Sequence, residues 1–282
     1  TIWLHLFGNG LVPSPENFGS QGQSPSHPEL LSWLADFFIT KGWSRKELIR
    51  KIVTSQTYRQ SSRHRLEYAG SDPDNRLLHR QNRKRVEAEI IRDLHLSVAG
   101  LLNTETGGES QFPPIPADVA AQSFANNFKW NVSKGSNRYR RGMYTFFKRT
   151  APAPNLMTFD CPDSNISITQ RNVSNTPLMA LTTLQNIVFH EASQALARRI
   201  EENPALTNNQ QRLEHLFKLT LSRIPEPKEL DIALGLLKEN LSHYLDHPDQ
   251  TLELCGESKP SLAAWTATVR IITNLDEFIT CP

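Results

Sequence analysis

Residues 26–53, SHPELLSWLADFFITKGWSRKELIRKIV, contain two capping boxes, and each is followed by apolar residues at helical spacing. Ser26 and Glu29 form the first box, and Ser44 and Glu47 form the second. The apolar side chains of each expected helix lie on one face: Leu30, Leu34, Phe37 and Phe38 in the first, and Leu48, Ile49, Ile52 and Val53 in the second. Gly42 lies between them as a helix stop. The stretch therefore predicts two short amphipathic helices joined by a tight turn, an αα-hairpin.

The same spacing recurs along most of the remaining chain. We expect a longer helix from about Asn82 to Val98. Another is expected to run to about Arg199, with Thr176 as its N-cap beside Pro177. Three more helices are expected further along, over residues 210–222, 225–245 and 261–279.

Three stretches depart from helical spacing. Residues 101–137 have the composition of a long loop, while residues 138–149 and 166–171 are expected as short strands or extended segments because they carry β-favouring side chains. The predicted fold is therefore mainly α, a helical domain of about six to eight amphipathic helices with a small extended or two-stranded central element.

Length and composition bound the class of protein. The chain has 282 residues, of which 38% are hydrophobic and 21% charged, and these values are typical of a globular domain. No apolar run approaches the length of a membrane-spanning helix, so no membrane span is expected. We expect one domain over residues 1–282, with a subdivision between residues 1–137 and residues 138–282. Because the chain starts at Thr1 without an initiator Met, we also expect it to be a processed chain or a piece of a longer one.

Charge is unevenly distributed, although the net charge is only +2. Residues 41–85 hold thirteen Lys and Arg against four acidic residues, a local charge of +9, whereas residues 225–257 hold two Lys against eight acidic residues, a local charge of −6. This asymmetry indicates either an anionic partner for the first half or docking of the two halves on each other. Nucleic acid is disfavoured as the partner because the arginines are spread over several helix faces.

A basic and aromatic segment is the densest group of polar residues, and its candidate ligand-binding residues are Arg140, Arg141, Tyr144, Lys148, Arg149, Asp160, Asp163 and Arg171. Guanidinium groups bind carboxylate, phosphate or sulfate through two hydrogen bonds, and aromatic rings stack on sugars or bases. The segment therefore permits a groove for an anionic ligand. The alternative is that its Arg and Asp side chains pair with one another and fix a proline-rich loop to the helices.

A second group lies in RKRVEAEIIRD, where Arg85, Glu89 and Arg92 occupy positions i, i+4 and i+7 of the expected helix. Glu89 between two arginines should stay ionised, which suits a structural ion-pair ladder. The alternative is an active site in which Glu87 and Asp93 also take part.

Other catalytic, metal-binding and cofactor-binding motifs are incomplete or absent. In HEASQ, Gln194 stands where a metalloprotease has its second His, and the spacing of His243 and His247 is better explained by an exposed helix end than by a metal site. The chain has no G-x-S-x-G, phosphate-binding Gly-Lys-Ser/Thr or C-x-x-C-H motif. Its three cysteines are widely spaced and match no zinc motif. We therefore predict no metal site and no cofactor within this segment.

Several strings, in order along nearly the whole chain, resemble the planctomycete-type PSD family, a domain of unknown function in planctomycete and verrucomicrobial proteins. They are FGNGLVPSPENFG, SHPELLSWLADFF, GWSRKELIRKIVTSQTYRQSS, DPDNRLLHRQNRKRVEAEIIRD, YRRGMYTFFKRTAPAPNLMTFDCPD, SNTPLMAL and NLDEFI. Two positions depart from the family pattern. Met179 stands where the family usually has Gln, and Ser167 stands where it often has Cys, so a redox or metal role for a cysteine there has no support.

The resemblance implies an exported bacterial protein in the periplasm or cell envelope, of which this chain is the C-terminal domain. It also implies upstream domains as partners, one of them often cytochrome-c-like, so haem is expected only on an upstream domain. The sequence contains no matched nucleophile and base. We therefore predict an accessory binding or interaction module for a partner domain or an anionic polymer, such as an anionic polysaccharide. Two alternatives stay open: an enzyme domain that acts on polysaccharide or is coupled to a haem domain, and a structural envelope scaffold.

Overall fold

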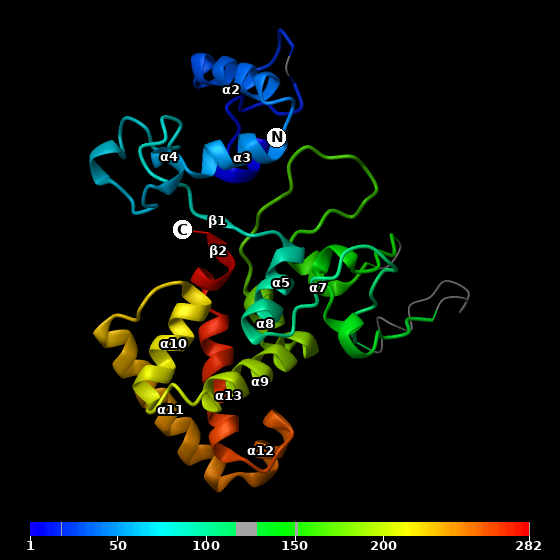
Figure 1. The fold of residues 1–282 in the computed structure, drawn as a ribbon, viewed down its shortest axis with the longest axis vertical. Coiled ribbons are helices and arrows are strands. Elements are labelled where there is room, and N and C mark those ends of the chain that lie inside the picture. The colour runs from blue at the N-terminus through cyan, green and yellow to red at the C-terminus, as the bar shows by residue number, and fades with distance from the viewer. Residues whose placement is uncertain (18, 117–128, 150–151, 282) are drawn as a thin grey trace. The chain divides into compact units, whose positions relative to one another are not determined.

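The computed structural model describes residues 1–17, 19–116, 129–149 and 152–281. The chain forms two compact units (Figure 1). Unit 1 consists of Thr1–Arg85, Ser167–Arg171 and Thr280–Pro282, and unit 2 consists of Val86–Ile166 and Asn172–Ile279. The main boundary therefore lies at Arg85 and Val86, well before the subdivision expected after residue 137, because the helix that follows Val86 packs with later helices of unit 2.

Unit 1 is built from short helices around a small core. They are α1 (Ile2–Phe7), α2 (Pro28–Thr40), α3 (Arg45–Val53), α4 (Gln56–Arg59) and the 3-10 turn η1 (Leu66–Tyr68). The buried residues of the core are Phe7, Leu11, Leu34, Leu48 and Ile52. The predicted αα-hairpin is confirmed as α2 and α3, which pack against each other.

Only one of the two predicted capping boxes caps its helix. The Ser44 hydroxyl accepts a hydrogen bond from the backbone N–H of Glu47 at 3.4 Å, as expected at an N-cap. The prediction for Ser26 is wrong, because α2 begins one residue later, with His27 at the N-cap position. The Ser26 hydroxyl instead donates to the carbonyl oxygen of Leu11 at 3.3 Å. Its hydrogen bond thus holds the preceding loop rather than the helix.

A two-stranded antiparallel sheet is present, but other residues form it. β1 (Lys84–Arg85) pairs with β2 (Thr280–Cys281), with Lys84 opposite Cys281. The small two-stranded element is thus confirmed. Residues 138–149 and 166–171, which were expected as short strands or extended segments, form no strand, and only part of the first region is extended. The first region lies in the 3-10 turns η3 (Gly135–Tyr139) and η4 (Gly142–Tyr144) and in extended backbone with two isolated bridges, and the second is a loop. Phe146 of the first region stacks on Phe112, with 4.7 Å between the ring centroids.

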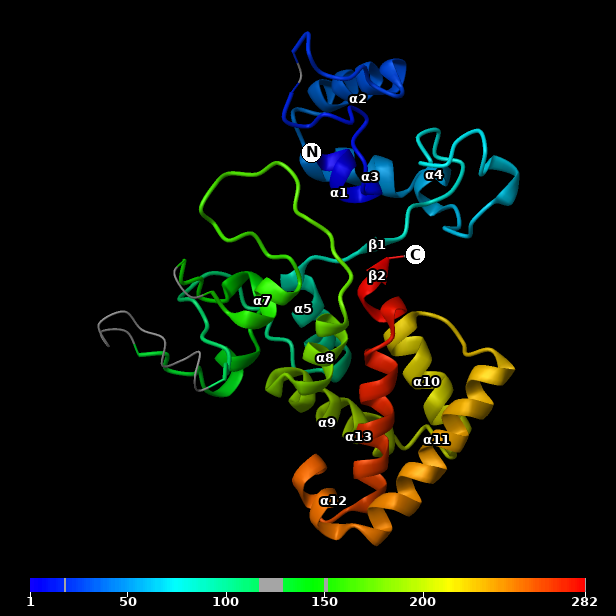
Figure 2. The same cartoon turned by 180° about the vertical axis from the view of Figure 1, so that it is seen from behind.

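Unit 2 is a helical assembly around α13. Its helices are α5 (Ala88–Ala99), α7 (Pro154–Thr158), α8 (Pro177–Gln185), α9 (Ile187–Glu201), α10 (Asn209–Leu221), α11 (Pro227–Asp246), α12 (Pro248–Cys255), α13 (Pro260–Thr273) and the 3-10 turn η5 (Asp276–Ile279). α13 packs against α9, α10, α11 and α12, and α5 packs against α9 (Figures 1 and 2). Buried side chains of α5, α9, α10, α11 and α13 form the main core. A smaller cluster joins α5 and α9 to α7 and α8.

The helices of unit 2 differ from the prediction at several points. α7 and α12 were not expected, and the helix expected over residues 261–279 ends at Thr273, before η5. α5 starts at Ala88 instead of about Asn82, because Lys84 and Arg85 are in β1. The helix expected to run from Pro177 to Arg199 is divided at Asn186, whose side-chain oxygen accepts the backbone N–H of Val188 at 2.9 Å and so caps α9. Thr176 occupies the N-cap position of α8, but its side chain makes no capping hydrogen bond.

The loop expected over residues 101–137 is confirmed over residues 101–116 and 129–134, whereas residues 135–137 belong to η3. Residues 101–116 and 129–134 contain no helix and no strand other than isolated bridges, and residues 117–128 lie outside the described residues. Among the helices that the structure describes, none combines the length and the apolar character that a bilayer crossing needs.

Candidate functional site

Arg140, a predicted ligand-binding residue, is committed to the protein itself. Its side chain is only 5% exposed and donates to the backbone carbonyl oxygens of Glu109, at 2.5 Å, and of Gly107. The guanidinium also lies over the ring of Tyr144, at 4.0 Å from the ring centroid, and the Tyr144 hydroxyl accepts the backbone N–H of Gly107 at 2.8 Å. Arg140 and Tyr144 therefore fasten the loop at residues 105–109.

Arg141 and Gly142 dock onto α5 through one carboxylate. Asp93 accepts the backbone N–H of Gly142 at 2.5 Å on one oxygen and the Arg141 guanidinium at 3.4 Å on the other. A Cβ atom on Gly142 would lie 2.4 Å from the carbonyl oxygen of Glu89, so only glycine allows this approach. Asp93 is thus a structural acceptor in this unit.

A charged network that the sequence did not predict lies beside this junction. Glu191 accepts two hydrogen bonds from the Arg138 guanidinium and one, at 3.2 Å, from the Tyr139 hydroxyl. Arg92 is 1% exposed and donates to the carbonyl oxygen of Arg138 at 2.6 Å, and its burial lowers its pKa to about 10. Glu191 belongs to the string HEASQ, so its carboxylate accepts hydrogen bonds from Arg138 and Tyr139 within the protein. Buried charge of this kind holds the segment in one position.

The remaining residues of the predicted segment differ in their surroundings. Asp160 accepts the backbone N–H and the hydroxyl of Ser174, both at 2.8 Å. Asp163 is exposed, and hydrogen bonds from the backbone and side chain of Asn165 lower its pKa. Lys148 has a partner in the protein, and Arg149 is exposed next to a residue outside the described range. Arg171 belongs to unit 1.

The helical ladder predicted for Arg85, Glu89 and Arg92 is wrong in one part. Arg85 lies in β1, so it cannot occupy a position one turn before Glu89 on α5. Glu89 Oε1 lies 3.8 Å from the Sγ atom of Cys161. Glu87 is the N-cap residue of α5, without a capping side-chain hydrogen bond. Among the described residues, no group of three His, Cys, Asp or Glu side chains is placed to hold a metal ion.

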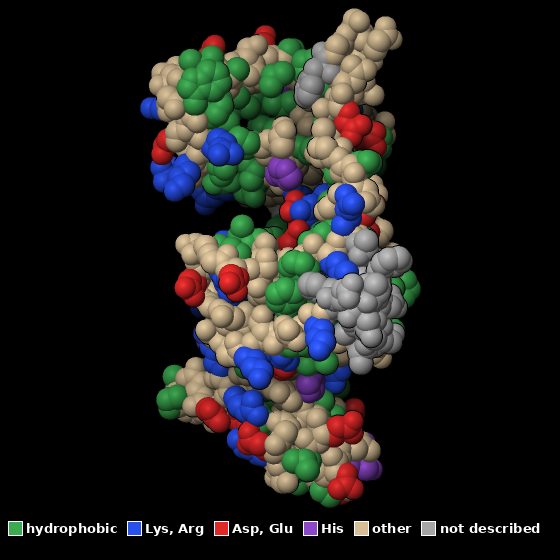
Figure 3. Space-filling model, turned by 90° about the vertical axis from the view of Figure 1, so that its right-hand side faces the viewer, with side chains coloured by type: hydrophobic (Ala, Val, Ile, Leu, Met, Phe, Trp, Pro, Cys, Tyr) green, Lys and Arg blue, Asp and Glu red, His purple; other side chains and the backbone are tan. Residues whose placement is uncertain are grey.

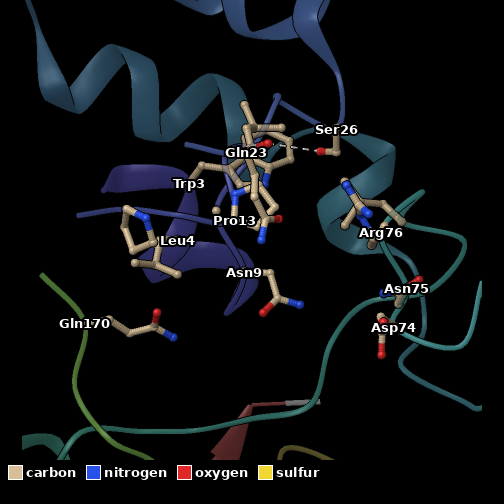
Figure 4. Close-up of a pocket in the computed structure, with 14 residues that line it drawn as sticks. Trp3, Leu4, Asn9, Pro13, Gln23, Ser26, Asp74, Asn75, Arg76 and Gln170 are labelled. Atoms are coloured by element: carbon tan, nitrogen blue, oxygen red, sulfur yellow. Dashed lines mark hydrogen bonds between the residues drawn. The ribbon is translucent and has the colours of Figure 1, made fainter. Parts of the chain in front are cut away.

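A cavity of about 290 Å³ in unit 1 is the better candidate for a site (Figure 4). It lies where the loop after α1, from Asn9 to Ser26, meets the loop at residues 74–78, and α1 adds Trp3 and Leu4. Gln170 also lines it. Two strings of the family resemblance, FGNGLVPSPENFG and DPDNRLL, thus meet at one cavity. The size is close to the lower end of the range usual for small-molecule sites.

The lining of the cavity combines an apolar and aromatic surface with a set of polar side chains. Trp3, whose ring stacks on Phe7 at a centroid distance of 4.2 Å, and the buried Leu4 and Leu11 give an apolar and aromatic surface. The polar side chains are those of Asn9, Gln23, Ser26, Asp74, Asn75, Arg76 and Gln170. In the view of Figure 4, Asn9 lies between Gln170 on one side and Asp74 on the other.

The loop that carries Asp74 and Arg76 is fixed by buried polar side chains. Asp72, 7% exposed, accepts the backbone N–H groups of Arg76 at 2.8 Å and of Leu77 at 2.9 Å. Asn75, 1% exposed, donates to the carbonyl oxygen of Arg80 at 2.8 Å and accepts the backbone N–H of the same residue at 3.3 Å. The exposed Asp74 and Arg76 are therefore presented by a rigid turn, as a binding group requires.

Five of the lining side chains are free to bind a ligand. Within the residues that the structure describes, Asn9, Gln23, Asp74, Arg76 and Gln170 make no side-chain hydrogen bond or ion pair with the protein. Sequence reasoning missed all five, because none of them belongs to the two groups of candidate residues that the composition singled out, and Gln170 lies in a stretch expected as a strand or extended segment. The available signal was the concentration of Asn, Gln and Asp in glycine- and proline-rich strings, since such loops carry function more often than packing.

Comparison with known families gives one match. Residues 1–237 match the family model PSD1, described as a protein of unknown function (DUF1553). The chain belongs to the PSD1 family. The match includes both loops of the cavity, so the candidate site lies within the PSD1 region, and it confirms the resemblance drawn from the sequence. No curated protein and no solved structure matches the chain at a significant level.

His95 provides a prediction about pH. Its Nδ1 donates to the carbonyl oxygen of Ile91 at 2.9 Å, its ring stacks on Phe189, and burial lowers its pKa to about 4. Between about pH 6.5 and 4 the unfolded chain binds a proton that the folded chain does not, so stability is lost as pH falls through this window. We expect a contribution of about 2 kcal/mol to be lost by pH 5 relative to pH 8.

Urea denaturation between pH 8 and pH 5 measures this loss, with His95→Gln as the comparison. The free energy of unfolding should depend less steeply on pH in the variant than in the wild type. The pH dependence that remains should include a contribution from His190, whose pKa is also lowered by burial and by Arg270. If the free energy of unfolding depended on pH equally in the variant and the wild type, His95 would not be the source of the loss.

Proposed function

We propose that the chain is an accessory binding module of an exported multidomain protein and that the cavity of unit 1 holds its ligand, a segment of polysaccharide. The proposal rests on five polar side chains that surround an apolar and aromatic surface and make no side-chain hydrogen bond or ion pair within the described residues. Amide, carboxylate and guanidinium groups donate and accept the hydrogen bonds of sugar hydroxyls, and an aromatic ring covers the apolar face of a sugar. Export, and a haem-bearing upstream domain, are proposed on the family resemblance.

The position of the site differs from the one expected from the sequence. Arg140 and Arg141 bond to the protein itself, which supports their structural interpretation and leaves unit 1 as the better place for a ligand. Residues 41–85 of unit 1 carry a local charge of +9, so an anionic polysaccharide is favoured over a neutral one by long-range attraction. On the face shown in Figure 3, Lys and Arg side chains lie in several separate places.

The number of carboxylate side chains in the cavity favours a binding function over glycoside hydrolysis. Glycoside hydrolysis usually needs two carboxyl groups about 5 to 9.5 Å apart. Asp74 is the one carboxylate among the described residues that line the cavity. The enzyme alternative therefore lacks its second acid at this position, and Asp74 is better suited to hold sugar hydroxyls.

Replacing Arg76 with Ala should weaken binding of an anionic oligosaccharide by roughly tenfold or more, because a charge-assisted hydrogen bond is lost. A glycan array with the whole chain would identify the oligosaccharide, and calorimetric titration would measure its affinity. Arg65→Ala is the matched control, since Arg65 is also an exposed arginine of unit 1 but does not line the cavity. Asp74→Asn, with Asp36→Asn as its control, tests the carboxylate in the same way. The proposal fails if no glycan binds or if the controls lower affinity as much as the cavity variants.

A further inference from the structure

A second cavity, of about 560 Å³, lies in unit 2 where the end of α8 and the start of α9 meet α11, α12 and α13. We propose that it binds a small monocarboxylate, an acid with one negative charge and a compact apolar body. Arg270, Tyr244 and His190 are the residues on which this assignment rests. The proposal is independent of the glycan site in unit 1.

Arg270 supplies a positive charge that no carboxylate of the described residues pairs with. Its guanidinium donates to the carbonyl oxygen of Leu184, while its Nε atom is buried without a hydrogen-bond partner among the described residues. Other arginines of the same unit are paired differently: Arg138 bonds to Glu191, and Arg223 to both Glu229 and Glu277. A guanidinium held in place by a carbonyl group and still unneutralised is a suitable receptor for a carboxylate.

Two of the groups that line the cavity with Arg270, Tyr244 and His190, carry no negative charge at neutral pH. Burial raises the pKa of Tyr244, so its phenol stays protonated as a donor. Burial and the charge of Arg270 lower the pKa of His190, so its ring stays neutral there. The amide nitrogen of Gln194 lies 3.0 Å from Nε2 of His190 and donates to the carbonyl oxygen of Leu254 at 2.7 Å, which fixes the ring.

The size and charge of the ligand follow from the rest of the cavity. Leu184, Ile187 and Leu254 line it, so an apolar body can pack beside the carboxylate. Glu253 also lines the cavity, and residues 225–257 carry a local charge of −6. A second negative charge on the ligand would be repelled by these groups, so polyanions and dicarboxylates are disfavoured and a single carboxylate is preferred.

Titration calorimetry with the whole chain tests the proposal, with benzoate as the probe. Benzoate should bind at least about tenfold more tightly than its neutral counterpart benzamide, and more tightly than the dianion terephthalate. Arg270→Gln, which keeps a donor for the Leu184 carbonyl, should weaken benzoate binding by about tenfold or more. The matched control is Arg199→Gln, because Arg199 also donates to a backbone carbonyl, that of Val98, but does not line the cavity.

Tyr244→Phe removes only a hydroxyl and should weaken benzoate binding by about three- to tenfold, so it decides the matter if Arg270→Gln fails to fold. The proposal is overturned if the wild-type chain binds no benzoate, if benzamide binds equally well, or if affinity is unchanged in both Arg270→Gln and Tyr244→Phe. Arg76→Ala, in the cavity of unit 1, should leave benzoate binding intact. Glycan binding and benzoate binding therefore report on the two sites separately.

Discussion

Replacing Asn75 with Ala is expected to lower the free energy of unfolding by about 2 to 4 kcal/mol and to abolish glycan binding. The side chain of Asn75 is buried and bonds to both backbone groups of Arg80 and, at 2.9 Å, to the side chain of Asn82. Ala would leave these groups unsatisfied in the interior, at a cost of about 1 to 3 kcal/mol. Asn75 also has φ +54, a left-handed conformation that Ala adopts only at a further cost of about 1 kcal/mol.

Asn75→Gly separates these two costs. Glycine adopts positive φ freely, so this variant should be about 1 kcal/mol less destabilised than Asn75→Ala while it loses the same hydrogen bonds. Urea denaturation followed by tryptophan fluorescence is a suitable measurement, because Trp3, Trp33 and Trp43 all lie in unit 1. A cost below about 1 kcal/mol for Ala would show that the buried hydrogen bonds do not hold the loop.

Glycan binding gives the second readout. Asp74 and Arg76 are the immediate neighbours of Asn75, and their positions at the cavity depend on the same turn. Each Asn75 variant should therefore lose affinity at temperatures where circular dichroism shows it still folded. Full affinity in a folded Asn75→Gly chain would mean that the two side chains do not depend on this turn.

Gly142→Ala should destabilise unit 2 by about 4 kcal/mol. The added Cβ would lie 2.4 Å from the carbonyl oxygen of Glu89 and 2.8 Å from its Cα, and both are backbone atoms of α5 that cannot rotate away. The segment would have to move off α5, which breaks the hydrogen bond of 2.5 Å from the Gly142 N–H to Asp93. A hydrogen bond to a charged group contributes about 1.5 to 3 kcal/mol, and overpacking adds about 1 to 3 kcal/mol.

Gly235→Ala is the matched control in the same unit. Gly235 is exposed within α11, and a Cβ there would meet no atom within 4 Å. Because Ala is the better helix former, this change should raise the free energy of unfolding by about 0.5 to 1 kcal/mol. Thermal unfolding of both variants compares them directly. Similar melting temperatures for the two alanine variants would contradict the close approach of Gly142 to α5.

The helices could be predicted where the sequence determines them locally. Leu34, Leu48 and Ile52 repeat at helical spacing and are buried as expected in α2 and α3. The sheet could not be predicted, because β1 and β2 have two residues each and their pairing depends on contacts far apart along the chain. The break at Asn186 was missed for a related reason, since an apolar pattern continues through a position where one side chain caps a new helix.

Side-chain chemistry was predicted less well than helices. The basic and aromatic composition of residues 138–149 indicated either a ligand groove or internal pairing, and sequence alone could not choose, because the carbonyl oxygens that Arg140 binds lie more than thirty residues earlier in the chain. The cavity of unit 1 was missed because Asp74 and Asn9 come from loops whose meeting depends on Asn82, which bonds to the carbonyl oxygen of Phe7 at 2.9 Å. Such long-range hydrogen bonds leave no periodic signal.

The pairing of β1 with β2 has a consequence for the order of folding. Lys84 and Cys281 are partners although about 195 residues separate the two strands. Closing so long a loop costs entropy that two short strands cannot offset early, whereas helix pairs such as α2 and α3 form from neighbouring residues. We therefore expect the helical hairpins to appear first in refolding and the strand pair to close last. During synthesis, unit 1 stays incomplete until the residues of β2 have left the ribosome.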